Sequence, residues 1–221
     1  MRFFIPAAGL GTRMNMQPHE AKEFLDQPDG TKMIDYALNL VQEPNDSVVI
    51  TREAKKQLVG YLRQTLRKGR KIKILEEETD GYAETMLSAS DMFKAKNVLI
   101  LPDTRFDQPA KILQEIEVAL TDHDLVFGVH EVIDSTEWGI IQDGKLYEKC
   151  ALVGPPEEYI NEEGEKGIRE GKLLAWGLIG FKANPGSDLF TSLMFNEQVD
   201  LSRYKVKLVK MTGFKDISRG I

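Results

Sequence analysis

The chain has 221 residues, a formal net charge of −6, 29% charged residues and 42% hydrophobic residues. This length suits one soluble domain, and an acidic chain with no long basic run is a poor candidate for general binding of nucleic acid. Its one cysteine excludes an intrachain disulfide and suits a reducing cytoplasm, and no apolar stretch approaches the roughly 20 residues that span a membrane.

The chain begins with an apolar run, residues 3–5, that predicts a first β-strand. The strand leads into the loop Ala7-Ala8-Gly9-Leu10-Gly11-Thr12-Arg13, and Lys22 follows. Two glycines permit unusual backbone angles, so several backbone N–H groups can point at one anion. The two cations add positive charge nearby. The pattern is compatible with a cradle for a triphosphate, although Gly-x-Gly alone favours a tight turn with two ordinary surface cations.

Strands and helices alternate over the next hundred residues. Apolar runs predict strands at residues 47–51, 71–75, 97–101 and 124–128. Amphipathic patterns predict helices at residues 33–41, 52–68, 81–93 and 109–120, the last opened by a proline. The alternation predicts a mainly parallel central sheet flanked by helices, which binds ligands at the carboxyl ends of its strands.

The rhythm changes after residue 130. Asp143-Gly144 lies between two short apolar runs and predicts a β-hairpin. A polar excursion at residues 154–172 precedes further elements, which are strands at residues 174–181 and 205–209 and a short helix at residues 188–195. We expect residues 1–221 to form one domain, with a nucleotide-binding half of about residues 1–130 and a smaller β-rich acceptor-binding half of about residues 131–221.

The string Ala-Ala-Gly-Leu-Gly-Thr-Arg-Met at residues 7–14, followed by Ala-Lys-Glu-Phe-Leu at residues 21–25, resembles the signature of the sugar-1-phosphate nucleotidyltransferases. The resemblance implies a Rossmann-like fold of the GT-A type. It also implies that residues 7–12 wrap a nucleoside triphosphate, that Arg13 grips the departing pyrophosphate and that Lys22 holds phosphate.

Four later segments match the same family in the same order. Residues 78–85 resemble the segment whose glycine, here Gly81, meets the nucleobase. Asp103 and Asp216 match the two aspartates that hold Mg²⁺, and the first of these also faces the nucleotide. Gly139, Glu148 and Lys149 match positions that bind the phosphorylated acceptor. Simpler interpretations are a turn at Asp103, a surface charge at Asp216 and a solvated Lys149.

The implied reaction is Mg²⁺-dependent transfer of a nucleotidyl group to a sugar-1-phosphate or similar phosphorylated acceptor, with release of pyrophosphate. The acceptor phosphate is already ionised at neutral pH, so the absence of a convincing catalytic histidine or serine is expected. His19, His123 and His130 show no spacing typical of metal ligands, and we expect all three on the surface or in loops. The resemblance suits a cytoplasmic enzyme of polysaccharide biosynthesis and leaves a homo-oligomer open.

The chain departs from the family pattern on the acceptor side, at Pro102, Trp138 and Cys150. The family usually has glycine, tyrosine and proline at these positions, so an unusual acceptor such as a polyol phosphate or phosphocholine stays open, as does the nucleobase. One alternative is a nucleotide-sugar-dependent glycosyltransferase, although the expected Asp-x-Asp pair is missing after the strand that ends at residue 101. A non-catalytic nucleotide-binding module is another.

Overall fold

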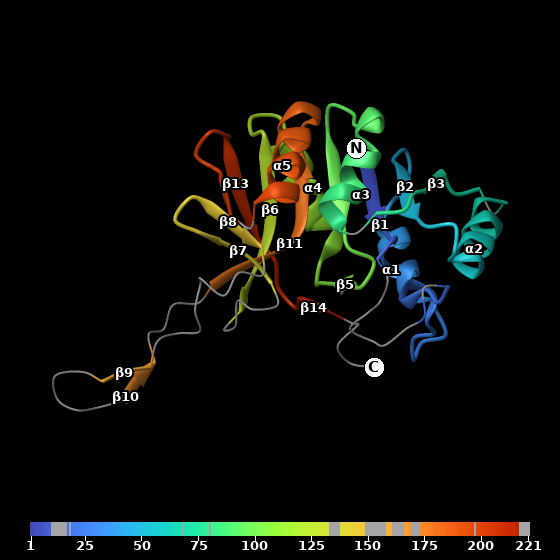
Figure 1. Ribbon diagram of the computed structural model, residues 1–221, viewed down its shortest axis with the longest axis horizontal. Coiled ribbons are helices and arrows are strands. Elements are labelled where there is room, and N and C mark those ends of the chain that lie inside the picture. Colours follow the sequence, from blue (N-terminus) through green and yellow to red (C-terminus); the bar gives the residue numbers. More distant parts are fainter. Residues whose placement is uncertain are drawn as a thin grey trace.

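The computed structural model describes residues 1–9, 17, 19–67, 69–79, 81–132, 138–148, 158–160, 166–168, 173–196 and 198–216. Its centre is a ten-stranded sheet (Figure 1). Four parallel strands lie in the order β4-β1-β2-β3 at one side of the sheet. Their bounds are β1 Arg2–Pro6, β2 Asp46–Thr51, β3 Ile72–Glu76 and β4 Asn97–Ile100. The predicted parallel core is confirmed.

The long strand β11 (Leu173–Phe181) runs antiparallel through the middle of this sheet. It pairs with β4 on one side and with β6 (Leu125–Val132) on the other, and β13 (Val206–Lys210) continues parallel to β6. The sequence indicated a strand here but assigned it to the added acceptor-side half. The structure instead places it between two strands of the first half.

The first residues of β11 pair with β7 (Gly139–Gln142), which begins a hairpin with β8 (Lys145–Glu148). The predicted turn is confirmed, since Asp143 and Gly144 have φ angles of 50° and 72°, the left-handed values that a two-residue hairpin turn requires. Beyond β8 lies β12 (Gln198–Asp200). The described residues also form two small antiparallel sheets. One pairs β5 (Thr104–Arg105) with β14 (Lys215–Asp216), and the other pairs β9 (Glu158–Ile160) with β10 (Lys166–Ile168).

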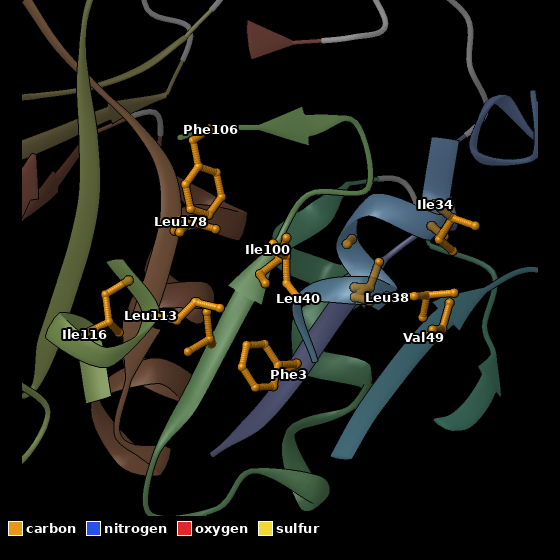
Figure 2. Packing of buried hydrophobic residues seen from close by; sticks show 14 of the residues in the cluster. Phe3, Ile34, Leu38, Leu40, Val49, Ile100, Phe106, Leu113, Ile116 and Leu178 are labelled. Carbon is orange, nitrogen blue, oxygen red and sulfur yellow. The ribbon is translucent and has the colours of Figure 1, made fainter. Parts of the chain in front are cut away.

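Helices cover both faces of the sheet through two buried clusters. One cluster holds side chains of α1 (Met33–Leu40), α2 (Lys56–Arg67) and α4 (Pro109–Ala119), and Figure 2 shows its packing around Phe3 and Ile100. The other holds side chains of α3 (Tyr82–Ser88) and α5 (Ala183–Phe195). The described residues also form two 3-10 helices, η2 (Lys22–Phe24) and η3 (Ser90–Met92). None of the described helices is long and apolar enough to cross a membrane.

The central strands are apolar at successive positions because both of their faces are covered. Phe3 and Ile5 of β1 belong to the first cluster, whereas Phe4 between them belongs to the second. In β4 the side chain of Leu99 likewise faces the opposite cluster from those of Val98 and Ile100. Each such side chain contributes about 1.5–3 kcal/mol by leaving water.

Helix boundaries differ from the prediction at three places. Helix α2 begins at Lys56 and not at residue 52, because residues 52–55 form a turn after β2. The segment predicted as one helix at residues 81–93 divides into α3 and η3 around Ala89, where φ is −102° and ψ is 10°. Helix α5 begins five residues early, at Ala183, although Asn-Pro-Gly is typical of a turn.

Candidate active site

The carboxyl ends of β1 to β4 meet at one edge of the sheet, and the predicted phosphate-binding loop begins there. Ala7 and Ala8 are buried, and the Ala7 N–H donates to the Ile50 carbonyl of β2 at 2.6 Å. Gly9 is exposed, and a Cβ added to it would meet no atom within 4 Å. The loop therefore leaves the sheet edge beside open space. Leu10, Gly11, Thr12 and Arg13 lie outside the described residues.

Lys22 and Asp103 meet at this edge, although they are 81 residues apart in the chain. Lys22 lies at the start of η2 and Asp103 follows β4, and the lysine Nζ donates to Asp103 Oδ2 at 2.5 Å. Asp103 is only 8% exposed. The structure thus brings together a proposed phosphate ligand and a proposed metal ligand.

The strand of Asp216 lies beside the residue that follows Asp103. In the antiparallel pair of β14 and β5, Asp216 is the partner of Thr104. Asp216 therefore lies on β14 opposite the residue that follows Asp103, although the side chain of Asp216 is outside the described part of the chain.

His130 was predicted on the surface or in a loop, and this prediction is wrong. It lies within β6, is only 7% exposed and stacks on Phe214 with ring centroids 3.5 Å apart and an interplanar angle of 10°. Burial lowers the pKa of His130 to about 4, so the ring is neutral near pH 7. The predicted strand ended at residue 128, two residues before His130, whereas β6 continues to Val132 and carries the histidine into the core. The stack holds Phe214 two residues before Asp216.

The predicted acceptor residues Gly139 and Glu148 lie opposite each other in the β7–β8 hairpin. Glu148 Oε1 accepts hydrogen bonds from the Tyr82 hydroxyl and from Trp176 Nε1, both at 2.7 Å. Burial, and then the Glu148 carboxylate, raise the pKa of Tyr82 well above its usual value, so the phenol keeps its proton and donates. A Cβ on Gly139 would lie 1.9 Å from Trp176 Nε1, so only glycine fits there. Lys149 and Cys150 lie outside the described residues.

Three charged residues behind the loop were not predicted. Lys55 is fully buried and its Nζ donates to the Ala7 carbonyl at 2.7 Å and to Glu23 Oε2 at 2.8 Å. Arg52, 7% exposed, donates through Nε to the Ala8 carbonyl at 2.6 Å. Burial lowers the pKa of Lys55 and raises that of Glu23, while the charge of each partner opposes the change. Glu23 lies in η2, and Arg52 and Lys55 follow β2, so no sequence pattern distinguished these three residues from surface charges.

The donor set fits Mg²⁺ that is bound together with a phosphorylated substrate. In the described part of the chain, no three histidine, cysteine, aspartate or glutamate side chains gather to hold a metal alone. Mg²⁺ commonly takes one or two carboxylates and completes its octahedron with waters and phosphate oxygens. The Asp103 carboxylate beside an open loop and the neighbouring strand of Asp216 suit that arrangement.

These features define an α/β protein whose predicted phosphate-binding loop begins at the carboxyl edge of parallel strands, the edge at which such sheets bind ligands. The chain matches the family model described as nucleotidyl transferase over residues 4–160, and it therefore belongs to that family. The membership that the sequence motifs predicted is confirmed. No curated protein sequence matches the chain.

Three solved structures share the fold over 98% of this chain. One, from Bacillus anthracis, is described provisionally as a glucose-1-phosphate thymidylyltransferase in complex with a sucrose; its TM-score is 0.71 at 18% identity, with 89% of that chain covered. HddC from Yersinia pseudotuberculosis gives 0.63 at 19% identity and 93% coverage. A protein from Thermus thermophilus, described as mannose-1-phosphate geranyltransferase, gives 0.66 at 13% identity and 76% coverage. At these identities the likeness concerns the fold alone.

Proposed function

We propose that this protein transfers a nucleotidyl group from a nucleoside triphosphate to a sugar-1-phosphate or similar phosphorylated acceptor and releases pyrophosphate, with Mg²⁺ required. The observation that carries the proposal is the meeting of Lys22, Asp103 and the strand of Asp216 beside the loop that starts at Ala7. A polyanion, a cation and metal-binding carboxylates can share that edge.

The reaction requires little proton transfer. An ionised phosphate oxygen of the acceptor forms a bond to the α-phosphorus, and the bond from that phosphorus to the oxygen bridging it to the β-phosphorus breaks, so pyrophosphate leaves with its electron pair. The protein must chiefly orient two polyanions, which can contribute roughly 7–11 kcal/mol to lowering the barrier. Loop N–H groups and Lys22 would bind phosphate, and Arg13 would bind the pyrophosphate oxygens in pairs.

Asp103 and Asp216 would hold Mg²⁺, which when bound supplies Lewis-acid stabilisation of charge on the reacting phosphate. Gly81, at the N-terminal end of α3, would lie against the nucleobase. On the acceptor side, the Glu148 carboxylate would accept hydrogen bonds from hydroxyls, and Lys149 would meet the acceptor phosphate. The sugar-1-phosphates named for two of the structural neighbours suit this assignment.

The test is pyrophosphate release, measured for each common nucleoside triphosphate against a panel of sugar-1-phosphates, polyol phosphates and phosphocholine. Release with at least one pair supports the proposal. Release of nucleoside diphosphate from a nucleotide sugar would indicate a glycosyltransferase instead. No product from any pair, despite nucleotide binding, would indicate a non-catalytic module.

Asp103→Asn should lower turnover at least about a hundredfold, because a neutral amide is a poor ligand for Mg²⁺. Nucleotide binding measured without metal should survive, since the amide keeps the shape of the carboxyl group. Asp122→Asn, which changes an exposed aspartate in the turn after α4, is the matched control and should leave turnover unchanged. Full activity of the Asp103 variant would remove this residue from the mechanism.

A further inference from the structure

Two cationic side chains lie buried behind the proposed phosphate-binding loop, and the reaction above does not use them. Arg52 and Lys55 come from one short turn between β2 and α2. Burying a cation costs free energy unless its N–H groups donate hydrogen bonds. The acceptors of these two side chains are therefore an essential part of the structure around them.

Both side chains donate to carbonyl groups of the loop. Lys55 Nζ donates to the Ala7 carbonyl at 2.7 Å, and Arg52 Nε donates to the Ala8 carbonyl at 2.6 Å. In a trans peptide plane the C=O and the following N–H point in opposite directions. The two cations therefore turn the N–H groups of Ala8 and Gly9 away from the protein side of the loop.

Those two N–H groups are left available. Among the described residues, neither Ala8 N–H nor Gly9 N–H donates a hydrogen bond. An anion in front of the loop would supply the missing acceptor, as in other backbone anion sites.

Arg52 also reaches a second nucleotide segment. Its Nη2 donates to the Thr79 carbonyl at 2.7 Å, and its Nη1 lies 3.1 Å from Glu78 Oε2. Thr79 precedes Gly81, the residue at the N-terminal end of α3, by two positions. One planar guanidinium thus spans the triphosphate loop and the segment proposed to face the base. A lysine ammonium lacks the fork of donors that spans two carbonyls in this way.

We propose that Arg52 is a positioning residue for the nucleotide, which holds the carbonyls of Ala8 and Thr79 so that the loop N–H groups stay directed at phosphate. The inference rests on the proposed function and adds a residue that touches no substrate. Lys55 acts in the same way on Ala7.

The experiment uses calorimetric binding of magnesium tripolyphosphate, a probe that needs no knowledge of the base. Arg52→Met should weaken binding at least about tenfold, the effect of losing a fixed donor set of this kind. Arg52→Lys keeps the charge and should still lose most of that affinity. Arg63→Met, at an exposed arginine of α2 that pairs with Glu76, is the matched control and should bind like the wild type.

Rescue separates positioning from simple loss of structure. Arg52→Ala vacates the volume of the guanidinium, so guanidinium chloride at about 10 mM should restore much of the affinity of this variant but leave the wild type unchanged, with sodium chloride as the ionic control. If Arg52→Met or Arg52→Lys binds like the wild type, or if guanidinium restores nothing in Arg52→Ala, the inference is wrong. If the wild type binds neither tripolyphosphate nor any nucleoside triphosphate, the proposed function fails, and the inference with it.

Discussion

The stack of His130 on Phe214 places a titratable ring where water is excluded, and neither ring nitrogen has a hydrogen-bond partner among the described residues. Because the folded pKa is about 4 and the unfolded value is near 6.5, the ring binds fewer protons in the folded protein than in the unfolded chain between these two pH values. His130 should therefore lower the free energy of unfolding as the pH falls through this window, and its effect should vanish above about pH 7.

His130→Phe should keep the stack and remove this pH dependence. Between pH 7 and pH 4.5, the wild type should lose about 2–3 kcal/mol more unfolding free energy than the variant, measured by urea unfolding. His19→Gln, at an exposed histidine, serves as the control and should follow the wild type. Parallel pH profiles for the wild type and His130→Phe would contradict the buried neutral ring.

In the β7–β8 hairpin, Gly139 leaves space for the pair of Trp176 with Glu148. Gly139→Ala would push its Cβ into the indole, which is held in the sheet and can only shift together with Glu148. We expect the KM for the acceptor to rise about tenfold or more, while the affinity for the triphosphate is unchanged. Steady-state kinetics with each substrate varied in turn measures the KM for the acceptor and the KM for the triphosphate separately.

Gly60→Ala in α2 is the matched control, because a Cβ there meets no atom within 4 Å. It should leave both KM values unchanged and raise the unfolding free energy by about 0.5–1 kcal/mol, as alanine is the better helix former. Equal kinetic effects of the two substitutions would argue against the tight fit at Gly139.

The elements that could be predicted are those whose burial leaves a local pattern. Strands β1, β2 and β4 are apolar on both faces. The dipeptide Asp143-Gly144 is typical of a two-residue hairpin turn and is uncommon elsewhere in strands or helices. The start of α5 was missed because Gly186, in its first turn, is there for close packing against the Phe181 ring. Such a contact between elements leaves no periodic trace in the sequence.

At the scale of the whole molecule, the position of Asp103 at the edge where the phosphate-binding loop begins followed from the rule that parallel strands share their carboxyl edge. The position of β11 between β4 and β6 did not follow from this rule, because tertiary contacts decide which distant strands pair. The inward cation Arg52 was also invisible, since an arginine after a strand has the same sequence pattern whether it faces water or buried carbonyls. The roles of Arg13 and Lys149 stay predictions.

The position of β11 has a consequence for unfolding. It lies between β4 and β6, and each buried cluster mixes residues from before and after residue 130, such as Phe3 with Leu178 and Phe4 with Phe181. Neither half can lose its partner without exposing its own core, so we expect one cooperative transition.

Two probes that report on different parts of the chain can measure this. Both tryptophans, Trp138 and Trp176, lie after residue 130, whereas four of the five described α-helices, α1 to α4, lie before it. Urea curves from tryptophan fluorescence and from far-ultraviolet circular dichroism should therefore share one midpoint and one slope. Trp138→Phe leaves Trp176 of β11 as the only emitter and should preserve the agreement. A fluorescence midpoint clearly below that of the helical signal would mean that the two halves unfold separately and that β11 does not bind them into one domain.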